Sequence, residues 1–237
     1  MISGVSIGAV NGFGMSLFSP EEDEYAAAFL KHFWEGLSKE VLYQNWPGGY
    51  MEALLERDSL YDNSIFFKYM DKLVKEKTIK RKISVGATDA IQGTFVRYNE
   101  SLSFEDMVTA VRASSAFPSA FPPVNFDNRV LIDGGVISNL DIAGAIQRCR
   151  EEVESDEDIV IDAILCTGAS IEEMDVKSFN PVQIGLRALE ITKYQETMGY
   201  VEQIRTDYPR VNLRYVVAPK DKLPSGALPI KFDQDAM

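Results

Sequence analysis

Residues 4–12 read Gly4-Val5-Ser6-Ile7-Gly8-Ala9-Val10-Asn11-Gly12 and begin with a G-x-S-x-G pentapeptide. This pattern is typical of a nucleophile elbow, in which a serine sits on a tight turn between a strand and a helix. Glycines are expected at positions 4 and 8 because side chains there would clash with the neighbouring strand and helix. The pentapeptide also occurs by chance in ordinary turns, so it indicates a catalytic serine only together with the rest of the chain.

The composition favours a single well-packed domain. The chain has 237 residues, 46% of them hydrophobic, which is enough for a large core. We therefore expect residues 1–237 to form one domain. The net charge of −12 argues against binding a nucleic-acid backbone and against electrostatic docking on anionic lipid. Any contact with a membrane surface is therefore expected to be transient, apolar and local.

The signals of several other protein classes are absent from the sequence. Cys149 and Cys166 are the only cysteines and lack metal-ligand spacing, so we expect buried free thiols in a reducing compartment. No phosphate-binding or dinucleotide glycine motif occurs, and no acidic loop suits calcium, so we expect neither metal nor organic cofactor. No apolar run is long enough to cross a bilayer, and no secretory signal is visible. These features predict a cytoplasmic protein or one that is peripheral at membrane surfaces.

Strand-like stretches alternate with helical ones, which predicts a layered α/β fold. Strand patterns cover residues 82–89, 93–98, 129–132, 159–166 and 211–217. Helical patterns cover residues 7–17, 63–77, 103–113, 141–150 and 182–205, and a further helix opens at Ser19. We expect residues 159–166 to be buried on both faces and the proline-rich residues 114–124 to be irregular. The helix after Ser19 is expected to present one face made of Tyr25, Ala28, Phe29, His32, Phe33 and Leu37.

A nucleophilic serine needs a base, and the sequence offers two candidates. The only histidine, His32, lies in an amphipathic helix, where a half-buried structural role is expected. Hydrolase triads built on this elbow place the histidine after the serine and the acid, and no histidine follows here. Asp133 ends a short apolar strand and precedes Gly134 and Gly135. Because α/β folds build their sites at strand ends, we favour a carboxylate acting directly on Ser6.

Four separated blocks, in matching order and spacing, resemble the patatin-like phospholipases, which are acyl hydrolases that use a Ser-Asp dyad in place of a triad. The blocks are GVSIGAVNG (residues 4–12), ATDAIQGT (87–94), RASSAFPSAFPPV (112–124) and LIDGGVISN (131–139). The resemblance implies a layered α/β/α fold with a mostly parallel central sheet. It also implies that the substrates are lipid acyl esters, such as phospholipids, galactolipids or acylglycerols.

The resemblance implies a role for each matching residue. Ser6 would be the nucleophile that forms an acyl-enzyme, and Asp133 the general base. The backbone N–H of Ile7 would donate a hydrogen bond to the oxyanion. Asn11 and Gly12 would shape the start of the helix. The proline-rich loop would support the site, with Phe117 and Phe121 either lining an acyl pocket or packing in the core.

Three departures from the family pattern lead to further expectations. The family carries a glycine-rich oxyanion loop on a first strand ahead of the serine, and this chain has no such segment. We therefore expect the first strand and half of the oxyanion hole to be missing, and the polypeptide to be inactive or feeble. Residues 233–237 end the chain where the family would continue into a helix. Asp141 replaces a proline after the DGG turn and is expected to alter only a loop.

Two alternative functions stay open at this point. The chain could be a non-catalytic member of the fold that binds lipid or a protein partner, which the absence of a glycine-rich loop would favour. It could also be a carboxylesterase that recruits His32 as its base.

Overall fold

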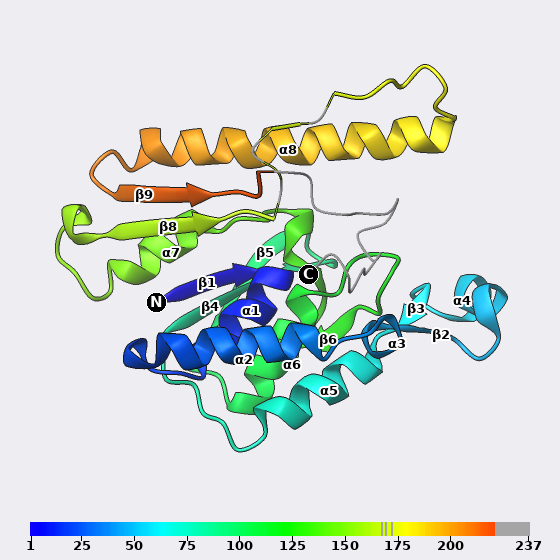
Figure 1. Ribbon diagram of the computed structural model, residues 1–237, viewed down its shortest axis with the longest axis horizontal. Helices are drawn as coiled ribbons and strands as arrows, with labels where there is room; N and C mark the ends of the chain where they lie inside the picture. The colour runs from blue at the N-terminus through cyan, green and yellow to red at the C-terminus, as the bar shows by residue number, and fades with distance from the viewer. Residues whose placement is uncertain (167, 169, 172, 221–237) are drawn as a thin grey trace. The chain divides into compact units, whose positions relative to one another are not determined.

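A computed structural model of the chain describes residues 1–166, 168, 170–171 and 173–220 (Figure 1). The chain divides into two compact units, of which the first spans Met1–Asp141 and the second begins at Ile142. The α/β class expected from the sequence is confirmed. The expectation of one domain over residues 1–237 stays a prediction, and residues 233–237 lie outside the described residues.

The first unit is built on a five-stranded sheet around β4 (Ile83–Asp89), which is buried along its whole length. β5 (Thr94–Asn99) pairs antiparallel with β4 from Ser84 to Asp89. The other edge of β4 is shared between two strands. Parallel β1 (Ile2–Val5) pairs with its first half, and antiparallel β7 (Arg129–Asp133) pairs with its second half. β6 (Val124–Phe126), which the sequence did not predict, extends the sheet beyond β7. The sheet expected to be mostly parallel thus combines the parallel β1–β4 pair with antiparallel β5, β7 and β6.

β1 and β7 run toward each other along this shared edge. Val5, the last residue of β1, pairs with Gly86, and Asp133, the last residue of β7, pairs with Ala87. Because Gly86 and Ala87 are consecutive, the two strand ends meet head to head. The sheet register therefore places the residue after β1 beside the residue that ends β7.

Helices α1 (Ile7–Ser16) and α6 (Phe104–Ser114) pack on the sheet and on each other. α2 (Asp23–Glu35) packs on α1, and α5 (Ser64–Val74) completes the helical layer around the core. These helices match the patterns expected over residues 7–17, 63–77 and 103–113. α6 begins with a cap in which Ser103 Oγ accepts a hydrogen bond from the Asp106 N–H at 3.1 Å. The largest fully buried side chains of this unit are Phe13, Leu17, Leu37, Met70, Ile83, Met107 and Leu131.

The buried face of α2 differs from the expected one. Ala26 and Phe33 are buried, whereas Tyr25 is 70% exposed and His32 is exposed. The expected half-buried position of His32 is therefore wrong. The face that packs inward follows Ala26, Phe29, Leu30 and Phe33, which is rotated by about one residue from the expected set. Packing against α1 selects this face, since several apolar stripes on the helix compete for burial.

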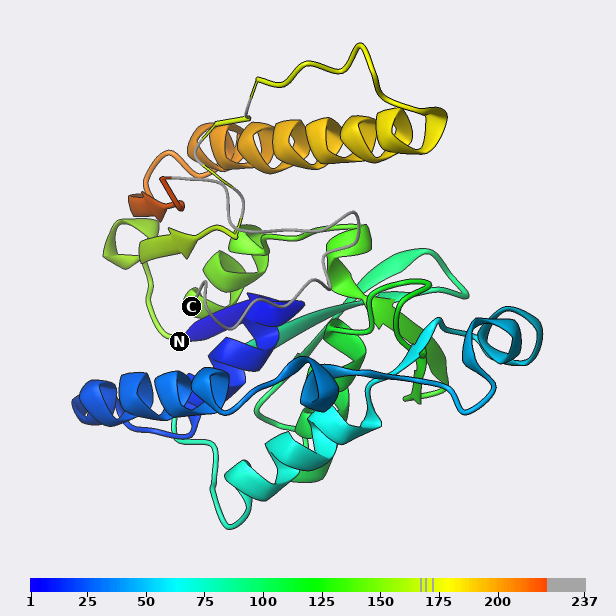
Figure 2. The same cartoon turned by 45° about the vertical axis from the view of Figure 1, so that its right-hand side comes forward.

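A short arm, residues 44–62, leaves the first unit after α3 (Lys39–Leu42). It consists of β2 (Gln44–Asn45), α4 (Gly49–Glu56) and β3 (Tyr61–Asp62), with β2 and β3 paired antiparallel. Figures 1 and 2 both show the arm extending from the rest of this unit. Its returning strand is held by hydrogen bonds from Leu60 N to Ser119 O (2.8 Å) and from Tyr61 N to Ala120 O (3.0 Å). The arm is therefore anchored to the proline-rich loop.

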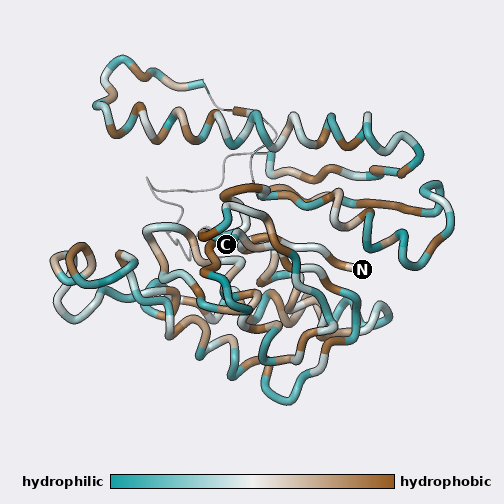
Figure 3. The backbone as a smooth tube through the Cα atoms, turned by 180° about the vertical axis from the view of Figure 1, so that it is seen from behind, coloured by the Kyte–Doolittle hydropathy of each residue, from teal (hydrophilic) through white to brown (hydrophobic). Residues whose placement is uncertain are grey.

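The second unit contains α7 (Ile142–Cys149), β8 (Val160–Ile164), α8 (Pro181–Asp207) and β9 (Asn212–Val217). β8 and β9 pair in parallel as a two-stranded sheet. The expectation that β8 is buried on both faces is wrong, because Val160 is 48% and Ile164 75% exposed. Figure 3 shows the largely apolar character of β8, and polar and apolar residues alternating along α8. Short 3₁₀ turns cover Pro20–Glu22, Gly134–Val136 and Asp156–Asp158.

The two cysteines are free thiols. Cys149, at the end of α7, is half-buried, and Cys166, just after β8, is exposed. The expectation that both are buried is wrong for Cys166, because β8 ends before it. No helix among residues 1–166 and 173–220 is long and apolar enough to cross a bilayer.

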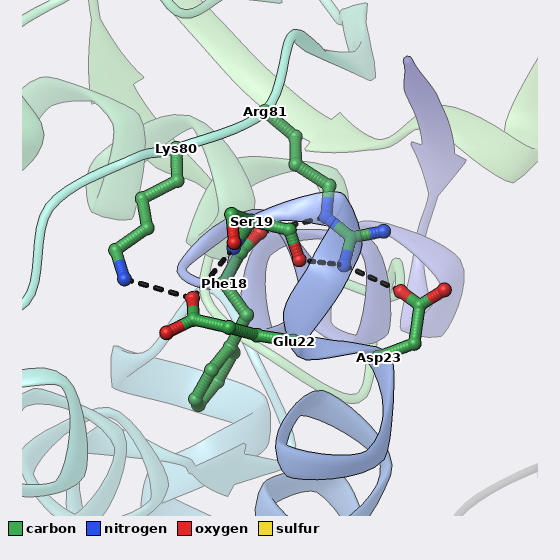
Figure 4. Close-up of polar contacts among 6 residues, drawn as sticks. All are labelled: Phe18, Ser19, Glu22, Asp23, Lys80 and Arg81. Carbon is green, nitrogen blue, oxygen red and sulfur yellow. Dashed lines mark hydrogen bonds and ion pairs between the residues drawn. The ribbon is translucent and has the colours of Figure 1, made fainter.

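Arg81 ties the corner between α1 and α2 to the segment that enters β4 (Figure 4). Its guanidinium donates to the carbonyls of Phe18 (2.7 Å) and Ser19 (2.6 Å) and pairs with Asp23 at 2.5 Å. Carbonyls beyond a helix end need partners outside the helix. Arg81 supplies them with a fork of donors that a lysine could not match.

Lys80, the residue before Arg81, makes a second ion pair at the same corner. Its ammonium lies 2.9 Å from Glu22 Oε2, which also accepts the backbone N–H of Ser19 at 2.8 Å. The hydrogen bond with Lys80, followed by that from the Ser19 N–H, lowers the pKa of Glu22 to about 2. A carboxyl whose pKa is lower in the folded chain stabilises the fold above its ordinary pKa.

We expect Glu22→Gln to remove a pH-dependent part of the stability of the first unit. The contribution of Glu22 is fully present above pH 4.5, its ordinary pKa, and is lost as the pH falls toward 2. Urea unfolding at several pH values should show wild type more stable than Glu22→Gln at neutral pH, with the difference shrinking below pH 4.5. Glu21→Gln, one position earlier on the exposed side of the turn, is the matched control. A difference that does not change with pH would contradict this assignment.

Candidate functional site

Ser6 occupies the turn between β1 and α1 in a strained backbone conformation. Its φ is 56° and its ψ is −126°. Residues other than glycine rarely adopt a positive φ, and such conformations cost about 1–3 kcal/mol and cluster at functional sites. The surrounding structure therefore has to hold this residue in place.

The two glycines of the pentapeptide differ in the space that surrounds them. A Cβ on Gly4 would lie 2.3 Å from the carbonyl oxygen of Gly8, so the strand and the first turn of α1 approach too closely for a side chain. A Cβ on Gly8 would meet no atom within 4 Å. The expectation of a clash is therefore correct for Gly4 and wrong for Gly8, which faces open space.

Ser6 and Asp133 are in direct contact. Ser6 Oγ donates a hydrogen bond to Asp133 Oδ2 at 2.5 Å, although the two residues are 127 positions apart in the chain. Asp133 is 3% exposed. Its other carboxylate oxygen accepts the N–H of Gly135 at 2.7 Å, and its own N–H donates to Ala116 O at 2.9 Å. One oxygen of a buried, oriented carboxylate is thus directed at the serine hydroxyl.

The glycines after Asp133 allow the turn to lie against the sheet. A Cβ on Gly134 would lie 2.4 Å from the carbonyl oxygen of Gly86 and 2.8 Å from a methyl carbon of Val5. A Cβ on Gly135 would lie 2.8 Å from Asn139 Oδ1 and 3.0 Å from Asp133 Oδ1. Close approach to backbone therefore requires glycine at position 134, whereas a side chain at position 135 would press mainly on the movable side chain of Asn139.

Sequence reasoning missed Ser114, which contacts the backbone of the elbow. Its hydroxyl accepts the N–H of Ser6 at 2.9 Å and donates to the carbonyl of Gly86 at 2.6 Å. Ser114 is the last residue of α6 and is fully buried. The only sequence signal was its place in the block of residues 112–124, where two adjacent serines precede the prolines.

Ile7 is the first residue of α1 and is 38% exposed. The first N–H groups of a helix have no acceptor within the helix, and the N-terminal end of the helix dipole favours negative charge. The amide of Ile7, next to Ser6, therefore lies at the end of α1 where the helix dipole favours negative charge.

The remaining expected residues lie elsewhere. His32 is exposed on α2, and the hydroxyl of Ser6 is bonded to Asp133. Phe117 and Phe121 are half-buried in the proline-rich loop, where the ring of Phe121 lies 6.3 Å from that of Tyr43.

Two residues near the motifs have roles that the sequence did not reveal. Asn11 lies inside α1, and its side chain accepts a hydrogen bond from Trp34 Nε1 of α2 at 2.8 Å, so it joins two helices. Asp141 is 7% exposed and accepts two hydrogen bonds from Arg97 of β5, at 2.6 and 2.8 Å. The expectation that Asp141 alters only a loop is wrong, because this ion pair ties the segment after the DGG turn to the sheet. No group of three histidine, cysteine or acidic side chains among the described residues is arranged to hold a metal ion.

The fold and the site define an α/β protein with a serine at a strained strand-to-helix turn and a buried carboxylate on its hydroxyl. The family model of the patatin-like phospholipases matches residues 1–146, which is more than half of the chain. The chain therefore belongs to the patatin-like phospholipase family, a family of lipid acyl hydrolases. The match covers Met1–Asp141 of the first unit, the part that contains Ser6 and Asp133. None of the curated proteins compared with the chain matches it.

We expect Gly4→Ala to destabilise the first unit by about 1–3 kcal/mol, because its new Cβ would press on backbone atoms that cannot move independently. Gly8→Ala should change the free energy of unfolding by less than about 1 kcal/mol, since the position is open and helical. Urea unfolding of the two variants, which differ from wild type by the same single methyl group, measures the contrast. Equal losses would show that the close approach at Gly4 is not what fixes the turn.

Proposed function

We propose that this chain carries the catalytic pair of a lipid acyl hydrolase, with Ser6 as the nucleophile and Asp133 as the general base. Because the sequence contains no glycine-rich oxyanion loop, we still expect the turnover of the chain itself to be feeble. The observation that carries the proposal is the 2.5 Å hydrogen bond from Ser6 Oγ to Asp133 Oδ2. A hydroxyl is a weak nucleophile until a neighbouring base accepts its proton, and a buried carboxylate within hydrogen-bond reach is suited to that task. Membership of a family of lipid acyl hydrolases supports the same reaction class.

In the first step, Asp133 accepts the proton of the Ser6 hydroxyl as Oγ attacks the carbonyl carbon of the ester. A tetrahedral intermediate forms, and the N–H of Ile7 donates a hydrogen bond to its oxyanion. The intermediate then collapses as the C–O bond of the ester breaks. The proton held by Asp133 passes to the leaving alcohol, and the acyl group stays on Ser6.

In the second step, Asp133 accepts a proton from water, and the resulting hydroxide attacks the acyl-enzyme. The fatty acid leaves, and the proton returns to Ser6 Oγ. The Gly135 N–H, bonded to the second oxygen of Asp133 at 2.7 Å, keeps the carboxylate directed at the serine during both steps. The substrates are acyl esters of lipids: phospholipids, galactolipids or acylglycerols.

A fluorophosphonate probe tests the dyad because it reacts rapidly only with an activated serine. We expect labelling of the wild-type chain to be lost in Ser6→Ala and slowed about 10²- to 10⁴-fold in Asp133→Asn. His32→Ala should be labelled at the wild-type rate, because His32 is exposed on α2. Labelling rates are followed by gel fluorescence or intact mass. Loss of labelling in His32→Ala would favour a histidine base, and no labelling of wild type would favour a non-catalytic lipid-binding member of the fold.

The same proposal includes contact with a lipid surface through α4, on the arm of residues 44–62. Four large apolar side chains of α4 are solvent-exposed: Tyr50 (58%), Met51 (67%), Leu54 (69%) and Leu55 (74%). Tyr50 and Leu54, like Met51 and Leu55, are one helical turn apart, so the four share one side of the helix. Figure 3 shows this apolar stretch on the arm.

The net charge of the chain favours contact of α4 with lipid that carries no net charge. With a net charge of −12, the chain gains nothing from anionic headgroups, so attachment depends on burying apolar side chains. The hydroxyls of Tyr50 on α4 and Tyr61 on β3 lie 3.4 Å apart, and amphipathic aromatic rings favour the headgroup level of a bilayer. We therefore propose a peripheral, transient attachment to zwitterionic or uncharged lipid.

We expect Leu54→Asp and Leu55→Asp each to weaken binding to phosphatidylcholine vesicles about tenfold or more, because each removes a leucine from the apolar side and adds a charge. Labelling of Ser6 by a soluble fluorophosphonate should be unchanged in both. Tyr25→Asp on α2, where the side chain is 70% exposed, is the control for adding a charge elsewhere on the same unit. Vesicle co-sedimentation measures the binding. Equal binding of all three variants and wild type would exclude α4 as the contact.

A further inference from the structure

The hydroxyl of Ser114 bridges two backbone groups at the point where the sheet opens into the elbow. Ser6 N–H can only donate and Gly86 C=O can only accept, so the two contacts of Ser114 Oγ, at 2.9 and 2.6 Å, fix the direction of its own proton. The hydroxyl accepts from Ser6 and donates to Gly86. Ser114 is 0% exposed, so no solvent competes for either bond.

This bridge takes the place of a hydrogen bond of the β1–β4 ladder. The ladder begins with Ile2 N–H donating to Lys82 C=O at 2.9 Å. In a parallel pair, alternate residues of a strand donate to alternate carbonyls of its neighbour, so the register of β1 and β4 would bring the Ser6 N–H to the Gly86 carbonyl. The strained turn at Ser6 moves the chain away from β4. The Ser114 hydroxyl then stands between the donor and the acceptor that the turn has separated.

The end of α6 also holds the second member of the dyad. Ala116, two residues after Ser114, accepts the N–H of Asp133 through its carbonyl at 2.9 Å. Ala116 N–H in turn donates to Ala113 O at 3.2 Å, which fixes the segment to the last turn of the helix. One short segment therefore positions the backbones of both Ser6 and Asp133, the first through a side chain and the second through the main chain.

We propose that Ser114 is a positioning residue that holds the nucleophile in its strained conformation, so that Ser6 Oγ reaches Asp133. The inference rests on the proposed function of the Ser6–Asp133 pair. Removing the hydroxyl leaves the Ser6 N–H and the Gly86 carbonyl without their partner, and the turn relaxes toward ordinary backbone conformations. The fraction of molecules with Ser6 Oγ on Asp133 falls, whereas the surface that a substrate contacts is unchanged because Ser114 is fully buried.

The adjacent serine provides a matched control. Among the contacts that the structure describes, the Ser115 hydroxyl donates only to carbonyls of α6. Its acceptors are Val111 O at 2.9 Å and Arg112 O at 3.3 Å. Ser115→Ala therefore removes a hydroxyl from the same turn of the same helix without touching the elbow. Ser114→Thr keeps the hydroxyl and serves as the conservative variant.

The first measurement is the kinetics of the intact chain. We expect Ser114→Ala to be labelled by the fluorophosphonate at least about tenfold more slowly than wild type, and to lower kcat on a short-chain ester with KM unchanged. Ser115→Ala should stay within about twofold of wild type, and Ser114→Thr should recover most of the lost rate. Ser114→Ala that reacts as fast as Ser115→Ala would overturn the proposal.

The second measurement does not depend on activity. Hydrogen exchange of the Ser6 amide, followed by NMR, should be at least about tenfold faster in Ser114→Ala than in Ser115→Ala. If wild type is not labelled, the proposed function fails, while the exchange rates still decide whether Ser114 holds the turn. If Ser114→Ala does not fold, Ser114→Cys keeps the side-chain volume with a weaker hydrogen-bonding group. Faster Ser6 exchange in that variant than in Ser115→Ala supports the proposal, and equal exchange overturns it.

Discussion

β1 and β7 share one edge of β4, and the whole site depends on this shared edge. Val5 pairs with Gly86 and Asp133 with Ala87, so the ends of two strands from distant parts of the chain meet on consecutive residues. Ser6 comes directly after one strand end, and Asp133 is the other. Their hydrogen bond therefore follows from the register of the sheet, and no mobile loop has to bring the two side chains together. Because the sheet is part of the core, the entropy of closing this long loop is offset by burial of the strands themselves.

The meeting of the strand ends leaves no room for side chains between them. Gly134 lies against the carbonyl of Gly86, and Gly4 lies against the carbonyl of Gly8. Ser6 stays in a conformation that costs free energy, held by contacts on either side of it. The DGG segment is fixed to the β4–β5 hairpin at both ends, through the pairing of Asp133 with β4 and through the ion pair of Asp141 with Arg97 of β5. A rigid frame of this kind is what a preorganised site requires.

Polar contacts and exposed apolar side chains lie on different parts of the first unit. The corner between α1 and α2 is closed by the Arg81 and Lys80 contacts, which satisfy carbonyls and carboxylates where the chain changes direction (Figure 4). The arm that carries α4 instead exposes large apolar side chains, although it is tied to the proline-rich loop through Leu60 and Tyr61. That loop continues from the same segment, residues 114–116, that contacts both Ser6 and Asp133. The arm is therefore hydrogen-bonded to the same stretch of chain that contacts the site.

The sequence alone determined the local features. The order of small and polar residues in GVSIG and DGG predicted a serine on a strand-to-helix turn and a carboxylate at a strand end, because tight turns depend on residues that lie next to each other in the chain. Hydrophobic periodicity predicted α1, α5, α6, α8 and most of the strands for the same reason. Only the tertiary structure decided that β7 joins β4 antiparallel, which face of α2 is buried, and that Asp141 and Ser114 contact the sheet and the elbow. These features depend on pairing and packing between segments far apart in the chain, and on competition among apolar faces for one core, which no local pattern specifies.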